Sequence, residues 1–341
     1  MLDSSLKDLV TRIRSGDAAA LETLADQLGP FFLKELLDRR QMLVPFAENL
    51  AIMCIHGAIE RLEAERDCDP AAIIAQVLDR KFNEWFQAFQ TDVKEASQLQ
   101  TALFPKPIPP HTGLEIAARS RPLRPINGDL YDFIARPMDL LVVLVDASGK
   151  GTAAGLFGAI AGGFFRGYTS GTESPSELLA LLDKAISGAS TDSKYLTAIL
   201  LSWRPAFRDV HVASAGLSAP LVSQNGLRKV LELQPGPLIG IDLPTGLVSE
   251  NHSEISLSLS TGDWVAIFSD GITDQSSSTD QEYGVDRLWE VIQLNAKKSV
   301  DIIIDEVFAD LDRHTGNTPR QDDQTLVLIR AAARDSDAAK Q

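Results

Sequence analysis

Residues 140–151 read Leu-Leu-Val-Val-Leu-Val-Asp-Ala-Ser-Gly-Lys-Gly. Six apolar residues in a row are typical of a buried β-strand, and the Asp-x-x-Gly that follows predicts a sharp turn. Asp146 would therefore close a strand at the edge of a sheet, and Gly149 and Gly151 would permit the turn. This stretch predicts a sheet whose edge carries a carboxylate.

Three further acidic sites follow the same local pattern. Asp270 comes after the apolar run 264–268 and before a glycine, and Asp322 and Asp323 come directly before the run 324–329. Asp129 lies in a turn that leads into another apolar stretch. If brought together, such carboxylates would hold hard divalent cations through oxygen ligands. Without a cation they would repel one another and raise one another's pKa.

For any single site, aspartate before glycine is ordinary turn chemistry. Four such sites, in a region with no competing histidine or cysteine site, favour a metal centre instead. The chain has two cysteines, Cys54 and Cys68, and five histidines, and their spacing does not match a zinc site.

Short β-rich runs characterise the region that holds these acids, at 114–118, 140–145, 196–203, 210–214, 255–259, 264–268 and 324–329. Helices are expected at 152–168, 175–187, 284–294 and 300–314. Because strands and helices do not alternate regularly, a doubly wound parallel sheet is disfavoured. The sequence predicts an α+β domain with mostly antiparallel sheets that are covered by helices.

The region before this domain is expected to be an all-α bundle of four or five helices. Asp17 begins one segment of helical spacing, and Asp69-Pro70 is an N-cap followed by proline at the first helical position. The helical pattern stops at Pro105, where four prolines within six residues make a stiff linker. The predicted parts are a helical regulatory or dimerisation domain (1–92), a helical linker ending in a proline-rich segment (93–110), the α+β domain (111–332) and a flexible tail (333–341).

The composition is that of an ordinary globular protein, with 44% hydrophobic and 23% charged residues. The length of 341 residues predicts two domains. The net charge of −15 argues against nucleic-acid binding, which depends on clustered lysine and arginine. There is no signal-peptide pattern and no apolar run long enough to span a bilayer, so we expect a cytoplasmic protein without membrane contact.

The turn Gly149-Lys-Gly-Thr-Ala-Ala154 also has to be compared with phosphate-binding loops. It fails as a Walker motif, because Gly151 stands where serine or threonine should follow Gly-Lys. It does match the G-x-G-x-x-A dinucleotide pattern, although Asp146 would stand close to the pyrophosphate. A nucleotide-binding oxidoreductase therefore stays open as a less favoured alternative.

Eight segments in order, covering about residues 97–331, resemble the SpoIIE-like branch of the PPM-type (type 2C, metal-dependent) protein serine/threonine phosphatases, which includes the RsbU regulators. They are QLQTALFPKPIPPHTGLEIAARSRPLRPINGDLYDF, LLVVLVDASGKGTAAGLFGA, YLTAILLSW, VHVASAGLSAPLV, PGPLIGI, GDWVAIFSDGITD, YGVDRL and QDDQTLVLIRA. Each segment alone is modest, but eight in the right order make a specific signal. The resemblance implies a β-sandwich flanked by helices that binds two Mn²⁺ or Mg²⁺ ions.

The resemblance also implies roles for individual residues. Asp146 and Asp270 would be the central metal ligands, with Asp146 bridging the ions. Asp129 would be a supporting acid close to the metals, and Asp322 the remaining metal-side carboxylate. Ala147, after the bridging aspartate, would offer its backbone carbonyl to a metal.

Three positions need separate interpretation. Lys150 either lies near the phosphate or is a solvated turn residue. Leu217 stands where the family commonly has histidine after Ala-Gly, which puts the role of that histidine in doubt but not the metal cage. Asn127 replaces the first glycine of a usual Gly-Gly pair, and we expect a harmless turn change because asparagine tolerates left-handed backbone angles.

The resemblance implies hydrolysis of phosphoserine or phosphothreonine in a protein, with water activated between two metal ions. It further implies a substrate such as a phosphorylated anti-anti-sigma (STAS) protein in a partner-switching pathway. The N-terminal helices are expected to bind an upstream regulator or to form a homodimer through the apolar stripe that includes Trp85, Phe86 and Phe89. The alternative is that this stripe only packs inside its own helical bundle, as most such stripes do. A non-catalytic binding member of the same fold is an alternative.

Overall fold

The computed structural model describes residues 4–39, 42, 44–65, 69–105, 113–168, 171–187, 194–241 and 252–333. The chain divides into two compact units, Met1–Lys94 and Glu95–Gln341. Most of the predicted proline linker and all but the first residue of the predicted tail lie outside the described residues. Within the described ranges, no helix has both the length and the apolar content that crossing a bilayer requires.

The first unit is helical, as predicted. It contains α1 (Ser4–Arg14), α2 (Ala18–Lys34), a π-helical turn (Glu35–Arg39), α3 (Val44–Ala64) and most of α4 (Pro70–Leu103). Asp17 caps α2, because its carboxylate accepts hydrogen bonds from the amides of Ala19 and Ala20. The buried core includes Leu24, Leu28, Phe32, Leu50, Ile73 and Ile74.

The second unit is a sandwich of two five-stranded antiparallel sheets in the part of the chain that is described. The strand orders are β1-β10-β9-β6-β7 in the first sheet and β2-β3-β4-β5-β8 in the second. The strands are β1 (Leu114–Arg121), β2 (Leu130–Ala135), β3 (Leu140–Ala147), β4 (Leu196–Arg204), β5 (Asp209–Ala215), β6 (Leu221–Gln224), β7 (Leu227–Lys229), β8 (Glu254–Ser258), β9 (Trp264–Phe268) and β10 (Gln324–Ala331). Alternate residues of both sheets fill the space between them, among them Val142, Trp203, Val265 and Val327.

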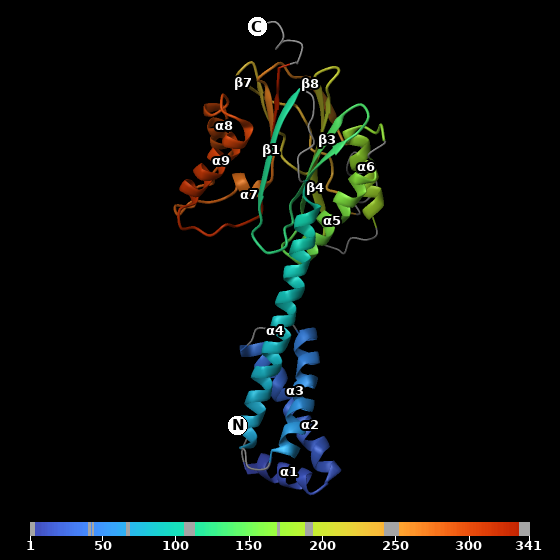
Figure 1. The fold of residues 1–341 in the computed structure, drawn as a ribbon, viewed down its shortest axis with the longest axis vertical. Helices are drawn as coiled ribbons and strands as arrows, with labels where there is room; N and C mark the ends of the chain where they lie inside the picture. Colours follow the sequence, from blue (N-terminus) through green and yellow to red (C-terminus); the bar gives the residue numbers. More distant parts are fainter. Residues whose placement is uncertain are drawn as a thin grey trace. The chain divides into compact units, whose positions relative to one another are not determined.

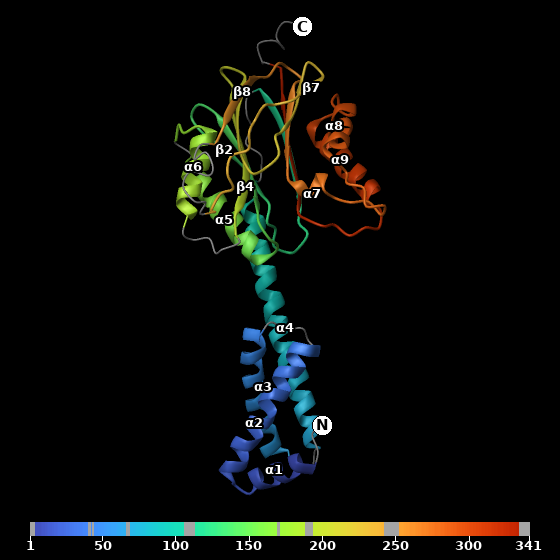
Figure 2. The ribbon, with the colours of Figure 1, turned by 180° about the vertical axis from the view of Figure 1, so that it is seen from behind.

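Helices cover both outer faces of this sandwich (Figures 1 and 2). The helices α5 (Thr152–Arg166) and α6 (Pro175–Ile186) pack on the second sheet. The helices α8 (Val285–Leu294) and α9 (Val300–Thr315) pack on the first sheet, and the single turn α7 (Asp270–Thr273) follows β9. The layers confirm the predicted α+β class and its antiparallel sheets.

The sequence does not predict the strands β2, β6 and β7. β2 has Asp132 in its interior, which interrupts the apolar pattern. In the structure this carboxylate is buried and pairs with the guanidinium of Arg166 at 2.5 Å. β7 is three exposed residues paired with β6, too short to show a period of two.

Candidate active site

The four predicted carboxylates come to one edge of the sandwich. Asp129 directly precedes β2 and Asp146 lies near the end of β3, so both belong to the second sheet. Asp270 opens the turn after β9, and Asp322 lies just before β10, so both belong to the first sheet. The site therefore depends on the packing of one sheet against the other.

Gly128 lies between residues that belong to the two sheets. A Cβ at this position would stand 3.1 Å from Oδ2 of Asp323 and 3.3 Å from the carbonyl oxygen of Ala147. The buried carboxylate of Asp323 accepts hydrogen bonds from the amides of Gly128 and Leu123, both at 2.6 Å. Asp323 thus joins the end of one sheet to the turn of the other. The Ala147 carbonyl, which the sequence predicts as a metal ligand, lies at the same place.

Asp129 is almost fully buried, at 1% exposure. Its Oδ2 accepts hydrogen bonds from the hydroxyls of Ser269 at 2.7 Å and Thr325 at 2.6 Å. Burial and the neighbouring charge of Asp146 raise the pKa of Asp129 well above its ordinary value, although the two hydroxyls act in the opposite direction. Oδ1 accepts no hydrogen bond from the described residues.

Asp146 is the acid on which the site centres. Burial raises the pKa of its carboxyl from 3.8 to about 7, and the charges of Asp270, Asp322 and Asp323 add to this effect. Thr197 donates a hydrogen bond to its backbone carbonyl, but within the described ranges no hydrogen bond or ion pair reaches its carboxylate. A half-buried carboxylate among other acids is costly unless it is protonated or neutralised by a cation.

Asp270 and Asp322 are more accessible. Burial, followed by the charges of Asp274 and Asp322, raises the pKa of Asp270. Asp322 forms an ion pair with Lys150, with Nζ and Oδ2 2.8 Å apart. Lys150 also donates a hydrogen bond to the carbonyl of Gln321. In this structure Lys150 is the counter-ion of Asp322, a predicted metal ligand, and its side chain is partly exposed.

The donor set fits a divalent cation in its chemistry. All the side-chain donors are carboxylates, the type that Mg²⁺ and Mn²⁺ prefer, and their repulsion is what a cation would relieve. Their arrangement is less complete than the sequence predicts. Among the described residues, no three carboxylate, histidine or cysteine side chains are placed so that they could together hold a metal ion.

The turn after Asp146 has the conformation that its glycines permit. Gly149 and Gly151 have φ angles of 88° and 80°, which disfavour any other residue. Gly151 is the N-cap of α5. The sheet before the turn is antiparallel and the carboxylates of Asp146 and Asp322 are close by, so this is not a dinucleotide-binding βαβ unit.

Two departures from the family pattern have clear outcomes. The side chain of Leu217 is buried in the core between the sheets. It therefore adds no polar group to the acidic edge, which is the edge of the sandwich that holds Asp129, Asp146, Asp270 and Asp322. Asn127 is not among the residues with positive φ, so its tolerance of left-handed angles is not used here. Its side chain instead makes hydrogen bonds that a glycine could not make.

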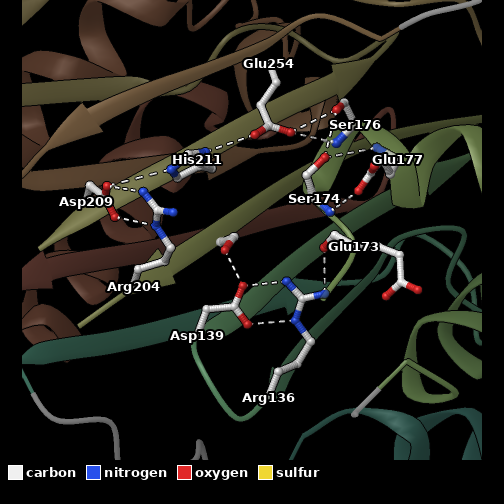
Figure 3. A network of polar contacts seen from close by, with 11 residues as sticks. Arg136, Asp139, Glu173, Ser174, Ser176, Glu177, Arg204, Asp209, His211 and Glu254 are labelled. Atoms are coloured by element: carbon white, nitrogen blue, oxygen red, sulfur yellow. Dashed lines mark hydrogen bonds and ion pairs between the residues drawn. The ribbon is translucent and has the colours of Figure 1, made fainter. Parts of the chain in front are cut away.

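A second cluster of charged residues lies where β3 begins and β4 ends, away from Asp146. Figure 3 shows its contacts. The guanidinium of Arg136 forms a buried ion pair with Asp139 at 2.5 Å. Asp139 directly precedes β3, whereas Asp146 lies near its end, so the two lie roughly 20 Å apart at about 3.3 Å per residue.

In the same cluster, Oε1 of Glu254 lies 2.9 Å from Nδ1 of His211, and its Oε2 accepts a hydrogen bond from the hydroxyl of Ser176 at 2.9 Å. Because the glutamate lies between the serine and the histidine, this is not a nucleophile–base pair. The contacts join α6 to β5 and β8, which indicates a structural role.

Sequence reasoning missed the groups that hold Asp129. Ser269 directly follows the predicted strand 264–268 and Thr325 is the second residue of the predicted strand 324–329, so both hydroxyls look like ordinary strand-end residues. The Asp-Asp pair at 322–323 did carry a signal, since consecutive residues at a strand end point in opposite directions. Asp323 accordingly turns inward to two amides while Asp322 faces Lys150.

Comparison with known proteins shows which family the chain resembles. The model described as Stage II sporulation protein E (SpoIIE) matches residues 136–332. Phosphoserine phosphatase RsbU of Bacillus subtilis is 22% identical over 189 residues, which are 55% of this chain and 55% of that protein. Protein IcfG of Synechocystis is 21% identical over 269 residues, 70% of this chain and 41% of that protein. The chain thus spans about half the length of the curated relatives it matches.

Solved structures share the fold. The SiaA-PP2C domain of Pseudomonas aeruginosa has a TM-score of 0.61 at 20% identity, covering 72% of this chain and 97% of that one. The PP2C phosphatase domain of SpoIIE from Bacillus subtilis, with a fragment of its regulatory domain, has a TM-score of 0.51 at 15% identity, covering 65% and 63%. With a family model over more than half of its length and PP2C domains as structural neighbours, the chain belongs to the SpoIIE family and has the PP2C fold.

Proposed function

We propose that this chain is a metal-dependent protein serine/threonine phosphatase. The observation that carries the proposal is the convergence of carboxylates from both sheets of a PP2C fold around Asp146, whose pKa rises to about 7. Acids placed so that they raise one another's pKa are a common feature of catalytic sites. The relative named phosphoserine phosphatase RsbU supports the same chemistry.

In this proposal the acids divide the work between them. Asp146 and Asp270 hold two Mg²⁺ or Mn²⁺ ions, with Asp322 and the carbonyl of Ala147 as further ligands. Asp129 supports them from the buried side, where Ser269 and Thr325 fix its carboxylate. The ions, when bound, supply an activated water and positive charge for the phosphoryl group. Lys150 leaves Asp322 and contacts the phosphate.

The substrate that we propose is a regulatory phosphoprotein, such as an anti-anti-sigma (STAS) factor in a partner-switching pathway. The test compares a phosphorylated STAS protein with an unrelated phosphoserine peptide, measuring kcat/KM for release of phosphate. We expect the STAS protein to be preferred by at least about tenfold, because a folded substrate contacts more than the phosphate. Equal values would contradict this choice of substrate.

For the first unit we propose binding of an upstream regulator or formation of a homodimer. Exposed apolar side chains on α3 and α4 support this, namely Phe46, Ile52, Met53, Phe86 and Phe89. Light scattering of the full chain, wild type and Met53→Ser/Phe89→Ser, tests the dimer. A wild-type monomer would overturn it.

The central experiment is hydrolysis of p-nitrophenyl phosphate by the full chain with added Mn²⁺ and with excess EDTA. We expect activity with Mn²⁺, none with EDTA, and none in Asp270→Asn, because a metal-binding carboxylate is lost. Asp280→Asn, an exposed acid in the loop after α7, is the matched control and should behave as wild type. Full activity in EDTA would disprove the metal mechanism. A folded wild type without phosphatase activity would favour the non-catalytic alternative.

A further inference from the structure

Asn127 is buried and uses every polar group that it has. Its backbone amide and carbonyl bond to the side-chain amide of Gln100, at 2.8 Å and 2.6 Å. Its own side-chain Oδ1 accepts a hydrogen bond from the amide of Asp129 at 3.1 Å, and Nδ2 donates to the hydroxyl of Ser120 at 2.7 Å. At 3% exposure, Asn127 is thus fixed from four sides.

A chain of hydroxyls continues from Asn127 to the carboxylate of Asp129. The oxygens of Ser120 and Thr325, paired residues of β1 and β10, lie 2.8 Å apart. The Thr325 hydroxyl also lies 2.6 Å from Oδ2 of Asp129. The hydroxyl of Thr325 therefore links Ser120, which Asn127 contacts, to the carboxylate of Asp129.

This arrangement holds Asp129 by its backbone and by one side-chain oxygen. Oδ2 is taken by two hydroxyls, and Oδ1 receives no hydrogen bond from the described residues. We propose that Asn127 is a positioning residue that orients Asp129 toward the cation of the acidic edge, with Gln100 holding Asn127 in place. The inference rests on the proposed function, because it presumes that a cation binds there.

Gln100 gives this arrangement its rigidity. It lies in the last turns of α4, within the second unit, and is 8% exposed. A side-chain amide that bonds both the N–H and the C=O of one residue fixes that peptide in a single orientation, much as a neighbouring strand would. The end of α4 is in this way connected to the backbone two residues before Asp129.

A glycine at position 127 would fold but would position Asp129 less firmly. A cavity of about 280 Å³ lies beside the group and is lined in part by Gln100, Ser120, Asn127 and Tyr131. Water from this cavity could satisfy the groups that a glycine leaves unpaired. Water does not fix an orientation as a covalently attached amide does. The substitution should therefore weaken metal binding more than it lowers thermal stability.

The test measures the Mn²⁺ dissociation constant of the full chain, from the EPR signal of free Mn²⁺, for wild type, Asn127→Gly, Gln100→Ala and the double variant. We expect each single variant to bind Mn²⁺ at least about tenfold more weakly, as is usual when a partner of a metal ligand is removed. The double variant should bind Mn²⁺ about as strongly as the weaker-binding single variant does, because both substitutions break the same hydrogen-bonded group. Hydrogen exchange should be faster in the peptide that contains Asp129.

Matched controls make the same chemical changes elsewhere. Asn225→Gly lies in the exposed β6–β7 turn, and Gln98→Ala lies on the exposed side of α4. Both should bind Mn²⁺ as wild type does. Mn²⁺ affinity within about twofold of wild type in Asn127→Gly would overturn the proposal. If that variant does not fold, the same result for Gln100→Ala overturns it.

A wild type that binds no Mn²⁺ would instead disprove the proposed function. The positioning of Asp129 would then be decided by hydrogen exchange alone. Unchanged exchange in Asn127→Gly would overturn the inference, and faster exchange would support it.

Discussion

The two ends of β3 treat buried acids in opposite ways. Before its start, Asp139 pairs with Arg136 and accepts a hydrogen bond from Ser202. Near its end, Asp146 has other acids for neighbours, and burial together with their charges raises its pKa to about 7. In the second cluster, the pKa values of Asp209 and Glu254 are lowered instead. A hydrogen bond from Arg204 lowers the pKa of Asp209.

The difference separates acids that serve stability from acids that serve chemistry. Where the chain supplies an arginine, the carboxylate is neutralised within the folded protein and needs no further ligand. Where the chain places several acids together, their repulsion lowers the stability of the fold, and a bound cation would neutralise their charge. The comparison therefore favours the edge around Asp146 as the candidate active site, independently of any relative.

The largest expected effect comes from a substitution that removes the charge of Asp146 and keeps the shape of its side chain. Asp146→Asn should lower turnover of p-nitrophenyl phosphate by about a thousandfold or more, because metal ions contribute several kcal/mol to phosphoryl transfer. Its melting temperature in EDTA should not fall, because repulsion is relieved. Calorimetry and steady-state kinetics on the same preparations measure both. Near-normal turnover would contradict the assignment of Asp146.

The next largest effect, at the other end of β3, is a loss of stability without a loss of turnover. Arg136→Met leaves Asp139 buried without its partner and should lower the free energy of unfolding by about 3–5 kcal/mol. Turnover per folded molecule should stay close to wild type, since the cluster lies far from the acidic edge. Denaturant titration with parallel activity assays measures this. A large loss of turnover in folded protein would mean that the two ends are coupled.

The pH dependence of stability should differ between metal-free and metal-bound protein. The pKa of Asp146 is raised from 3.8 to about 7, so between these values the folded state binds more protons than the unfolded chain. Without metal, this residue's contribution is therefore complete below about pH 4 and is lost as pH rises through about 7. Saturating Mg²⁺ should reverse this slope, and Asp146→Asn should make it shallower, because Asp129 and Asp270 also have raised pKa values. Melting temperatures between pH 5 and 8, in EDTA and in Mg²⁺, measure this slope for wild type and for the variant.

The smallest effect concerns Lys150. Its ion pair with Asp322 is partly exposed, with 35% and 42% of the two side chains accessible, so Lys150→Gln should change stability by less than about 1 kcal/mol. Removing a positive charge beside the site should tighten Mg²⁺ binding by a few-fold, which titration calorimetry measures. Weaker Mg²⁺ binding would mean that Lys150 holds Asp322 in its metal-binding position.

Much of this architecture could be predicted because it depends on local patterns. The apolar run 140–145 with its Asp-x-x-Gly turn predicted β3 and the place of Asp146. Proline and glycine marked the turns, and the Asp69-Pro70 pair predicted the start of α4. Local spacing also placed Asp270 and Asp322 at strand ends.

What could not be predicted depends on partners far along the chain. Asp132 interrupts β2 in sequence, yet Arg166 neutralises it from a helix. Neither interpretation of Lys150, near the phosphate or solvated, includes its ion pair with Asp322, which lies far along the chain. Asn127 was interpreted from backbone preference alone, whereas its role comes from Ser120 and Asp129. Such pairings are set by the packing of sheets, which no local window contains.

The pairing of β1 with β10 has a consequence for synthesis. These strands pair along their whole length, with Leu114 opposite Ala331, although they are nearly the first and the last elements of the second unit. A nascent chain that stops before residue 322 already carries Asp129, Asp146 and Asp270. It lacks β10 and the residue before it, so Thr325 and Asp323, which bond to Asp129 and Gly128, are missing. Translation must therefore pass through β10 before the acidic edge exists, and truncated products released from the ribosome carry no assembled site.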